Sequence, residues 1–154
     1  MSDAAARAVV EKFYEAYDTR DPQRIAAHLD NDVEWNVYGP IEAMQVCGQW
    51  RGKAAVVDRF TREIPHVIDK SIFERDCLLV DGGQSAAFGR VTSRQRKTGR
   101  IISHRCAHFI TWRDDKVLSF RVINDSLDAV EQFLGHRIDL SADMEVSESD
   151  IVAI

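Results

Sequence analysis

A single carboxylate at a strand–helix junction is the residue of this sequence best placed to do chemistry. The segment 116–124 alternates like a strand and runs directly into a helical pattern that ends near Gly135, and Asp125 stands where the two meet. An acid at a strand end, beside whatever cavity the sheet encloses, can transfer protons. The same position suits a helix N-cap, and Asp125 with Asp128 resembles a shortened capping box. Proton transfer and helix capping are therefore both open for Asp125.

A second chemical candidate is the segment His104-Arg-Cys106-Ala-His108. Alternation along a strand places its two histidines and its cysteine on one face. A closed zinc site needs four ligands, and no fourth ligand is evident near this segment. Ile102 and Ile110 share the same face, so the segment is interpreted as buried packing without a metal.

Other catalytic and cofactor motifs are missing from the sequence. Arg51-Gly-Lys53 lacks the spacing of a phosphate-binding loop, so nucleotide binding is unsupported. No Ser-His-Asp or Cys-His arrangement with a nucleophile signature is present. We therefore expect a protein that works without a cofactor.

The elements that must position these residues follow from periodicity and turn signals. Helices are predicted over 3–19, over 22–29 after the cap Asp21 and Pro22, between Gly52 and Pro65, and over 125–135. Strands are predicted over 33–38, 67–80, 84–96, 101–113 and 116–124. The long strands are separated by Asp81-Gly-Gly83, Lys97-Thr-Gly99 and Asp114-Asp115, which are turn signals typical of antiparallel neighbours. Helices followed by a meander of strands predict an α+β fold.

Composition restricts the class of protein. The 154 residues suffice for one domain, and no apolar run approaches the roughly 18 residues of a membrane span. The N-terminus lacks the pattern of a secretion signal, and three widely spaced cysteines are typical of reduced thiols, so a cytoplasmic location is expected. A net charge of −5 disfavours nucleic acid and anionic membranes as partners. Residues 136–154 form an acidic tail, following a basic stretch between Arg90 and Arg121.

The order of elements and several local motifs resemble the nuclear transport factor 2-like superfamily. The matching motifs are Val9-Val-Glu-Lys-Phe-Tyr-Glu-Ala-Tyr-Asp-Thr-Arg-Asp21, Leu29-Asp-Asn-Asp-Val-Glu-Trp35, Gly48-Gln-Trp-Arg-Gly52 and Ala107-His-Phe-Ile-Thr-Trp-Arg-Asp-Asp-Lys116. The resemblance covers roughly residues 5–135 and implies one domain over 1–135. It implies a cone: a curved, largely antiparallel sheet wrapped around N-terminal helices, with an interior pocket and a C-terminal helix. It also implies a homodimer, with the His104–His108 face at its interface.

Within the superfamily the sequence is most similar to the SnoaL-like polyketide cyclases. The similarity lies in an aspartate nine residues after Lys116, followed by Ser-Leu and Gln-Phe-Leu-Gly. In those enzymes this aspartate is the catalytic acid/base, which implies that role for Asp125. The residues of ketosteroid isomerases would fall at Phe13, Val37 and Ala107, none of which can transfer a proton. Epoxide hydrolases of the limonene type would need carboxylates where Thr92 and Val122 stand.

The resemblance also sets the expected orientation of the strands. Side chains expected to face the pocket are Arg90, Thr92, Arg94, Arg105, Ala107, Phe109, Phe120, Val122 and Asn124. Arg105 or Arg90 would stabilise an enolate, and Asn124 and Thr92 would orient the substrate. Apolar walls would come from Trp35, Val37, Phe109 and Phe120, with a hydroxyl from Tyr14 or Tyr17.

These residues predict a cyclase or isomerase in which Asp125 abstracts a proton beside a carbonyl, without a metal. The ligand would be a small organic molecule, partly apolar and with anionic character. Two other functions fit the same fold: a non-catalytic module that binds small ligands or proteins, and a hydrolase in which Asp125 activates water on an epoxide.

Overall fold

The fold consists of a six-stranded sheet and short helices, in a computed structural model that describes residues 3–141. The helical segments are α1 (Asp3–Asp18), α2 (Pro22–Ala26), α3 (Lys53–Asp58), the π-helix η1 (Arg59–Glu63), α4 (Ile64–Val67) and α5 (Ser126–Leu134). The strands are β1 (Leu29–Tyr38), β2 (Gly48–Arg51), β3 (Ile68–Asp81), β4 (Gln84–Gln95), β5 (Ile101–Arg113) and β6 (Lys116–Asn124).

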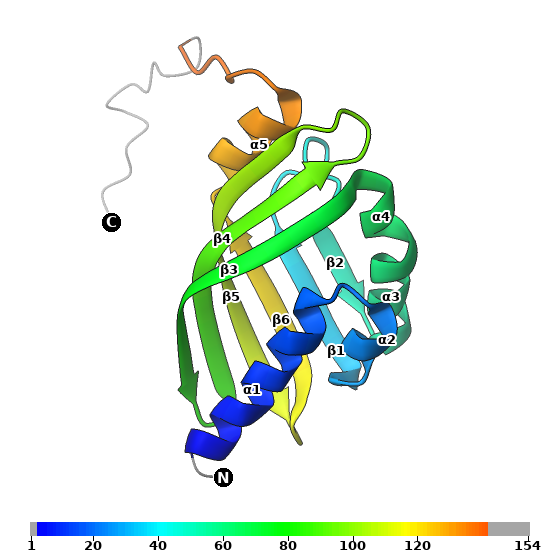
Figure 1. The fold of residues 1–154 in the computed structure, drawn as a ribbon, viewed down its shortest axis with the longest axis vertical. Coiled ribbons are helices and arrows are strands. Elements are labelled where there is room, and N and C mark those ends of the chain that lie inside the picture. The colour runs from blue at the N-terminus through cyan, green and yellow to red at the C-terminus, as the bar shows by residue number, and fades with distance from the viewer. Residues whose placement is uncertain (1–2, 142–154) are drawn as a thin grey trace, which may run out of the picture.

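The sheet is open, curved and largely antiparallel. Its strand order is β2-β1-β6-β5-β4-β3, and β1 runs parallel to β6 while every other neighbouring pair is antiparallel. The sheet curves around α1, and α5 lies at the end of the sheet where β6 stops (Figure 1). The predicted α+β class and the curved, largely antiparallel sheet are confirmed.

Local sequence signals explain how the N-terminal elements begin and end. The predicted cap is confirmed, because Asp21 Oδ1 accepts hydrogen bonds from the backbone amides of Gln23 (2.9 Å) and Arg24 (3.3 Å). The helix after it ends at Ala26, and β1 begins at Leu29, four residues earlier than predicted. The strand β2 lies in a segment that was predicted as a loop.

The third helical region departs from the prediction that it ends before Pro65. It continues to Val67 through the wide π turn of Arg59–Glu63. Proline removes a backbone N–H, so a regular α-helical ladder cannot pass through this point unchanged. Single π turns inside helices are frequent at functional sites, and this turn carries the buried residues Arg59 and Phe60.

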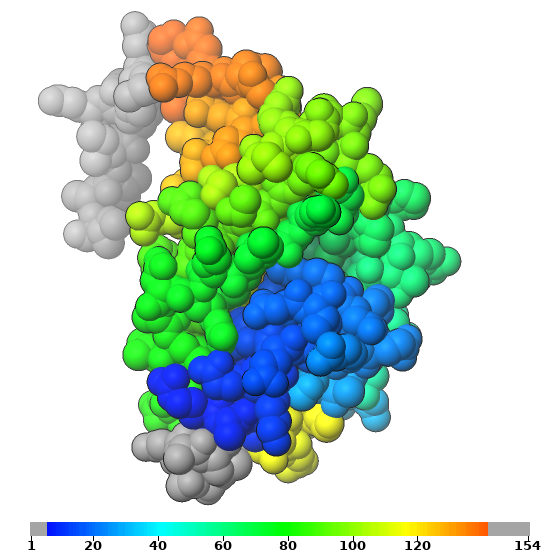
Figure 2. Space-filling model, viewed as in Figure 1, coloured from blue at the N-terminus to red at the C-terminus, as the bar shows by residue number. Residues whose placement is uncertain are grey.

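The core lies between α1 and the inner face of the sheet, by which we mean the face turned toward α1. Phe13, Tyr14, Trp35 and Phe120 are at most 1% exposed, and the rings of Trp35 and Phe120 stack with centroids 3.9 Å apart. Burying each such ring stabilises the fold by about 1.5–3 kcal/mol. The helix α1 packs along β3, and their side chains form one surface in the space-filling view (Figure 2).

Within residues 3–141, none of the helices has the length and apolar character that crossing a bilayer requires.

Candidate functional site

An interior cavity of about 220 Å³ lies beside the aromatic core. Its apolar walls come from α1, β1, η1, the inner face of β3–β6, and α5: Tyr17, Trp35, Phe60, Phe73, Val122 and Phe133. Its polar lining includes Arg20, Arg59, His104, Cys106, His108 and Asn124. The volume is below the 300–1,000 Å³ typical of sites for drug-sized ligands, so the cavity suits a small organic molecule.

The inward face of β4 and β5 is the opposite of the one predicted. The side chains of β5 that line the cavity are Ile102, His104, Cys106 and His108, and those of β4 are Val91 and Ser93. Arg90, Thr92, Arg94, Arg105, Ala107 and Phe109 therefore lie on the outer face.

The error on β4 and β5 is a matter of register. On β6 the predicted face is the inner one, because Val122 and Asn124 line the cavity. The ladder sets His108 opposite Val122 and Cys106 opposite Asn124, and directly opposed residues share a face. The predicted set combined the inner face of β6 with the outer face of β4 and β5, so Arg90 and Arg105 stand opposite each other outside the cavity.

The other predicted binding residues lie in or beside the cavity. Tyr17, Trp35, Val37 and Asn124 line it. Phe120 is fully buried against Trp35 in the core. The Tyr14 hydroxyl is buried and hydrogen-bonded to His108 Nδ1 at 3.2 Å. Tyr14 is thus engaged with a protein side chain, whereas Tyr17 remains at the cavity wall.

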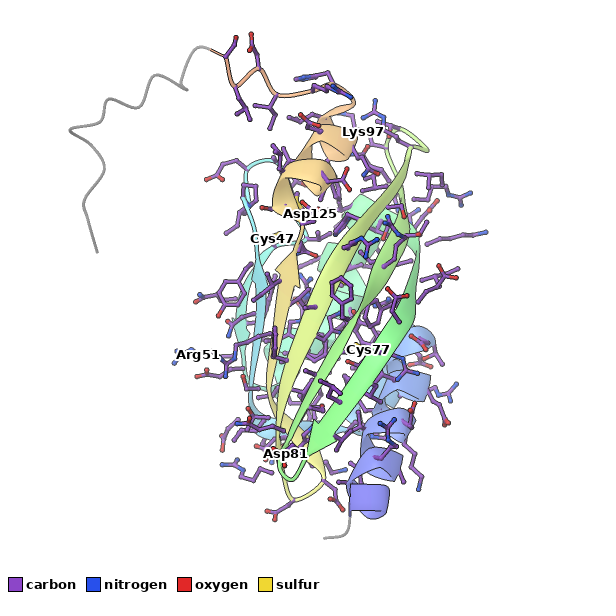
Figure 3. All side chains as sticks on the ribbon, turned by 90° about the vertical axis from the view of Figure 1, so that its left-hand side faces the viewer. Cys47, Arg51, Cys77, Asp81, Lys97 and Asp125 are labelled. Carbon is purple, nitrogen blue, oxygen red and sulfur yellow. The ribbon has the colours of Figure 1, made fainter. Side chains whose placement is uncertain are left out.

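Asp125 lies outside the cavity. It occupies the N-cap position of α5, at the end of β6 (Figure 3). Its side chain is exposed and makes no capping hydrogen bond; its backbone amide donates to the carbonyl of Arg105 at 2.9 Å. In this structure Asp125 therefore neither reaches the cavity nor caps α5 through its carboxylate.

His104 is held at the cavity wall in a defined tautomer. The Asn124 amide Nδ2 donates to the Tyr38 carbonyl at 3.1 Å, which turns Asn124 Oδ1 toward His104 Nε2, 3.1 Å away. Because Oδ1 can only accept, Nε2 carries the proton and Nδ1 keeps its lone pair. Nδ1 is buried and has no hydrogen-bond partner among the described residues.

The electrostatic surroundings keep His104 neutral at pH 7. Burial lowers its pKa, and the charge of Arg90 acts in the same direction. The hydrogen bond that His104 donates to Asn124 and the charges of Asp128 and Asp125 oppose that fall. The charge of Asp125 thus raises the pKa of His104, whose Nδ1 keeps its lone pair.

Arg59 is an unpaired cation in the wall of the cavity. It is 4% exposed, its Nη2 donates to the Val46 carbonyl at 2.7 Å, and its guanidinium lies 3.8 Å from the centroid of the Trp50 ring. Nε and Nη1 are buried without a partner among the described residues. Burial lowers the pKa of Arg59 to about 10, so the side chain remains charged at neutral pH.

Arg20 supplies a second cation. It follows α1 in the left-handed region, with φ at 57°, a conformation that is uncommon for residues other than glycine. Its guanidinium lies 4.1 Å from the centroid of the Tyr17 ring, and Nε and Nη2 are buried without a partner among the described residues. The cavity is therefore lined by two arginines that carry several buried N–H donors without an acceptor among the described residues.

His108, which lines the cavity, forms a fully buried pair with Tyr14. Burial lowers the pKa of His108 to about 3, and Arg20 and Arg75 act in the same direction. Cys106 Sγ lies 3.9 Å from His108 Nε2, and burial raises the pKa of its thiol to about 12. His108 is thus a neutral packing residue, and Cys106 is an unreactive thiol.

The face that carries His104, Cys106 and His108 was expected at a dimer interface. It faces the interior of the fold instead, so an interface between subunits cannot form there. Across the described part of the chain, no three side chains of the His, Cys, Asp and Glu types converge as a metal site would require.

Sequence reasoning missed Arg20, Arg59 and the catalytic potential of His104. For Arg59 a signal existed, because it lies three residues after Val56 and immediately before Phe60, on the apolar side of the predicted helix. A cation on the buried face of an amphipathic helix is unusual and indicates a function. Arg20 had no comparable signal, since a turn residue gives no indication of its side-chain direction.

Comparisons with known proteins agree with this architecture. The family model for the SnoaL-like domain matches residues 10–120. A candidate isomerase from Rhodopseudomonas palustris is 26% identical, with a TM-score of 0.70 over 88% of this chain and 98% of that one. A protein of unknown function from Burkholderia pseudomallei is 21% identical, with a TM-score of 0.74 over 86% and 98%. TerC, co-crystallised with polyporic acid, is 20% identical, with a TM-score of 0.70 over 82% and 98%. Among curated proteins, none matches the sequence.

Proposed function

The chain belongs to the SnoaL-like domain family within the nuclear transport factor 2-like superfamily, and from its cavity we propose a metal-independent enzyme of the isomerase or cyclase type. In this proposal His104, in place of Asp125, takes a proton from a carbon beside a carbonyl. The ligand is a small, partly apolar and anionic organic molecule. The observation that carries the proposal is the buried Nδ1 lone pair of His104 at the cavity wall, which has no partner among residues 3–141.

The proposed proton transfer conserves charge and electron pairs. The C–H bond beside the carbonyl breaks, His104 Nδ1 receives the proton, and the electron pair forms the enolate. Arg20 and Arg59 supply the positive potential that stabilises the oxygen anion in a site with apolar walls. Return of the proton to a different carbon isomerises the ligand, whereas attack of the enolate carbon on an internal electrophile closes a ring.

The arrangement also explains how Asn124 participates. It was expected to orient the substrate, but its amide bridges Tyr38 and His104. Asn124 thereby acts as a positioning residue that selects the tautomer of the base. Such support from a second residue is common for histidines at functional sites.

Solvent hydrogen exchange tests this proposal. Proton NMR in D₂O would follow loss of the hydrogen beside the carbonyl in a panel of small aromatic keto esters and keto acids. His104→Gln keeps a donor near Asn124 but removes the lone pair, and it should reduce exchange by about 10²–10⁴-fold. Arg105→Gln is the matched control and should retain exchange, and Asp125→Asn should retain most of it, because it changes only the charge near His104. Loss of exchange in Asp125→Asn but not in His104→Gln would contradict the assignment of the base.

A non-catalytic binding module is the second candidate. One observation favours it: the carboxylate at the cavity, Asp69, is already bound by Arg94 Nε at 2.8 and 3.1 Å, and no acid is left to act as a second proton carrier among the described lining residues. Saturable ligand binding without exchange of any compound in the panel would support this function.

We also propose that the protein is a homodimer through the outer face of its sheet. Leu79, Phe88, Phe109 and Ile123 are exposed there by 38–67%. Glu74 stands opposite Arg90 in the same ladder, so the face carries both signs of charge, as a self-complementary two-fold contact requires. Phe109→Glu should yield monomers in light scattering, whereas the same change at the exposed loop residue Ile41 should not; equal masses for the two variants would count against this interface.

A further inference from the structure

The charge of the cavity is opposite to the charge of the protein. The whole chain carries a net charge of −5. The charged residues that line the cavity are Arg20, Arg59, Lys70, Arg96 and Asp69. The carboxylate of Asp69 is neutralised by Arg94, outside this set, whose Nε contacts both carboxylate oxygens. An acidic protein has therefore gathered its cations around an interior space, which favours an anionic occupant.

The deep cations are arranged as a binding site that lacks its acceptor. Arg59 is only 4% exposed, and its Nε and Nη1 have no hydrogen-bond partner among the described residues. Arg20 adds two more buried nitrogen atoms of the same kind. A buried N–H without an acceptor costs about 1–3 kcal/mol, and more when the group is charged. A fold can keep such unpaired donors when a bound ligand supplies the missing acceptor.

The planar fork of a guanidinium group matches the two oxygens of a carboxylate. Arg59 is held in place by the Val46 carbonyl on one nitrogen and by the Trp50 ring on its face. Arg20 is likewise stacked on Tyr17. Because both guanidinium groups are preorganised by these contacts, little side-chain entropy is lost when an anion binds.

We propose that the ligand is a keto carboxylic acid, whose carboxylate binds Arg20 and Arg59 while the carbon beside its keto carbonyl faces His104. The carboxylate and the reacting carbonyl are separate groups, and only the second depends on the proposed proton transfer. Two guanidinium groups facing one carboxylate leave one positive charge uncompensated. That charge is available to the enolate oxygen that proton abstraction creates.

The rim of the cavity supports the same ligand class. Lys70 and Arg96 are the exposed members of the described lining, and both are cations. Neither has a carboxylate within 4.0 Å among the described residues. Exposed charges of this kind accelerate association, whereas buried charges mainly set the dissociation rate. The rim therefore attracts the anion and the deep arginines retain it.

Binding of benzoate and of its neutral isostere benzamide tests the inference. Tryptophan fluorescence reports binding, because Trp35 lines the cavity and Trp50 packs on Arg59. Benzoate should bind at least about tenfold more tightly than benzamide. Arg59→Gln should abolish that preference, and Arg59→Lys should retain part of it. The exposed outer-face variant Arg121→Gln is the control and should leave the preference unchanged.

The rim is tested by stopped-flow kinetics at low and high salt. The double change Lys70→Gln and Arg96→Gln should slow benzoate association several-fold at low salt, leave dissociation unchanged and lose its effect at high salt. Thermal unfolding shows whether Arg59→Gln is folded; if it is not, Arg20→Gln carries the same test. Equal affinity for benzoate and benzamide in the wild type, or an unchanged preference in both arginine variants, would overturn the inference.

The result is separable from the proposed reaction. His104→Gln should keep the preference for benzoate while losing hydrogen exchange. A protein that exchanges neutral keto esters but does not prefer benzoate would retain the proton-transfer function and exclude the carboxylate site. A protein that prefers benzoate but exchanges nothing would retain the carboxylate site alone.

Discussion

The fully buried histidine His108 should make this fold sensitive to mild acid. It is 2% exposed, and its ring lies 4.1 Å from Phe73 and 4.8 Å from Phe120, measured between centroids. Burial, with the charges of Arg20 and Arg75, lowers its pKa from 6.5 to about 3. The unfolded chain thus binds a proton at pH 5 that the native protein does not bind.

The sign and size of the effect follow from proton linkage. Because the native pKa lies below the unfolded pKa, stability falls as pH drops from about 6.5 toward 3, by about 1.4 kcal/mol for each pH step. Between pH 7 and pH 5 the loss from His108 alone is about 2 kcal/mol. Burial also lowers the pKa values of His28 and His104, so these two histidines add a loss of the same sign.

Urea unfolding of the wild type and of His108→Gln isolates this contribution. Glutamine does not titrate and can still hydrogen-bond the Tyr14 hydroxyl, while the remaining histidines are common to both proteins. The variant is expected to be less stable at pH 7, because it loses aromatic packing, but its stability should fall by about 2 kcal/mol less between pH 7 and pH 5. Parallel pH profiles for the two proteins would refute the reasoning.

Three further changes test other parts of the structure. Asp125→Asn should lower the pKa of His104 further, because the carboxylate opposes the effect of burial; NMR titration measures this, and an unchanged pKa would show that Asp125 has no influence on the site. Gly89→Ala should cost at least about 3 kcal/mol, because a β-carbon would lie 2.0 Å from the Glu74 carbonyl oxygen; a loss below about 1 kcal/mol in urea unfolding would contradict this close approach. Arg113→Gln should cost little stability despite its contacts with two aspartates, because its side chain is 46% exposed; a loss as large as that of Gly89→Ala in urea unfolding would indicate a stronger ion-pair network.

Much of the secondary structure could be predicted because its signals are local. The strands predicted over 101–113 and 116–124 have the bounds of β5 and β6, since the turn residues between them are adjacent in sequence. The Asp21–Pro22 helix start likewise depends on neighbouring residues only. The strand β2 was missed, because four residues paired at an edge leave little periodicity. The π turn was missed because its cause, Pro65, also predicts a simple helix end.

The candidate site was predictable only in part. Four of the predicted binding residues, Tyr17, Trp35, Val37 and Asn124, line the cavity, because helical spacing and strand alternation indicate which positions are buried. The cations and the base could not be assigned in the same way. Arg20, Arg59 and His104 are separated by tens of residues in the chain, and no short-range pattern links them.

The sequence by itself determined that β5 alternates and that its odd and even positions lie on opposite faces. It could not decide which face is inward, because Ile102 and His104 on one face and Ile101 and Arg105 on the other are similarly mixed in polarity. Tertiary structure made that choice through the β5–β6 register, which sets His108 against Val122, and through α1, which covers the face that carries the histidines. A shift of one residue exchanges every side chain between cavity and solvent. The chemistry of this protein therefore depends on long-range packing that places His104 inside and Arg105 outside.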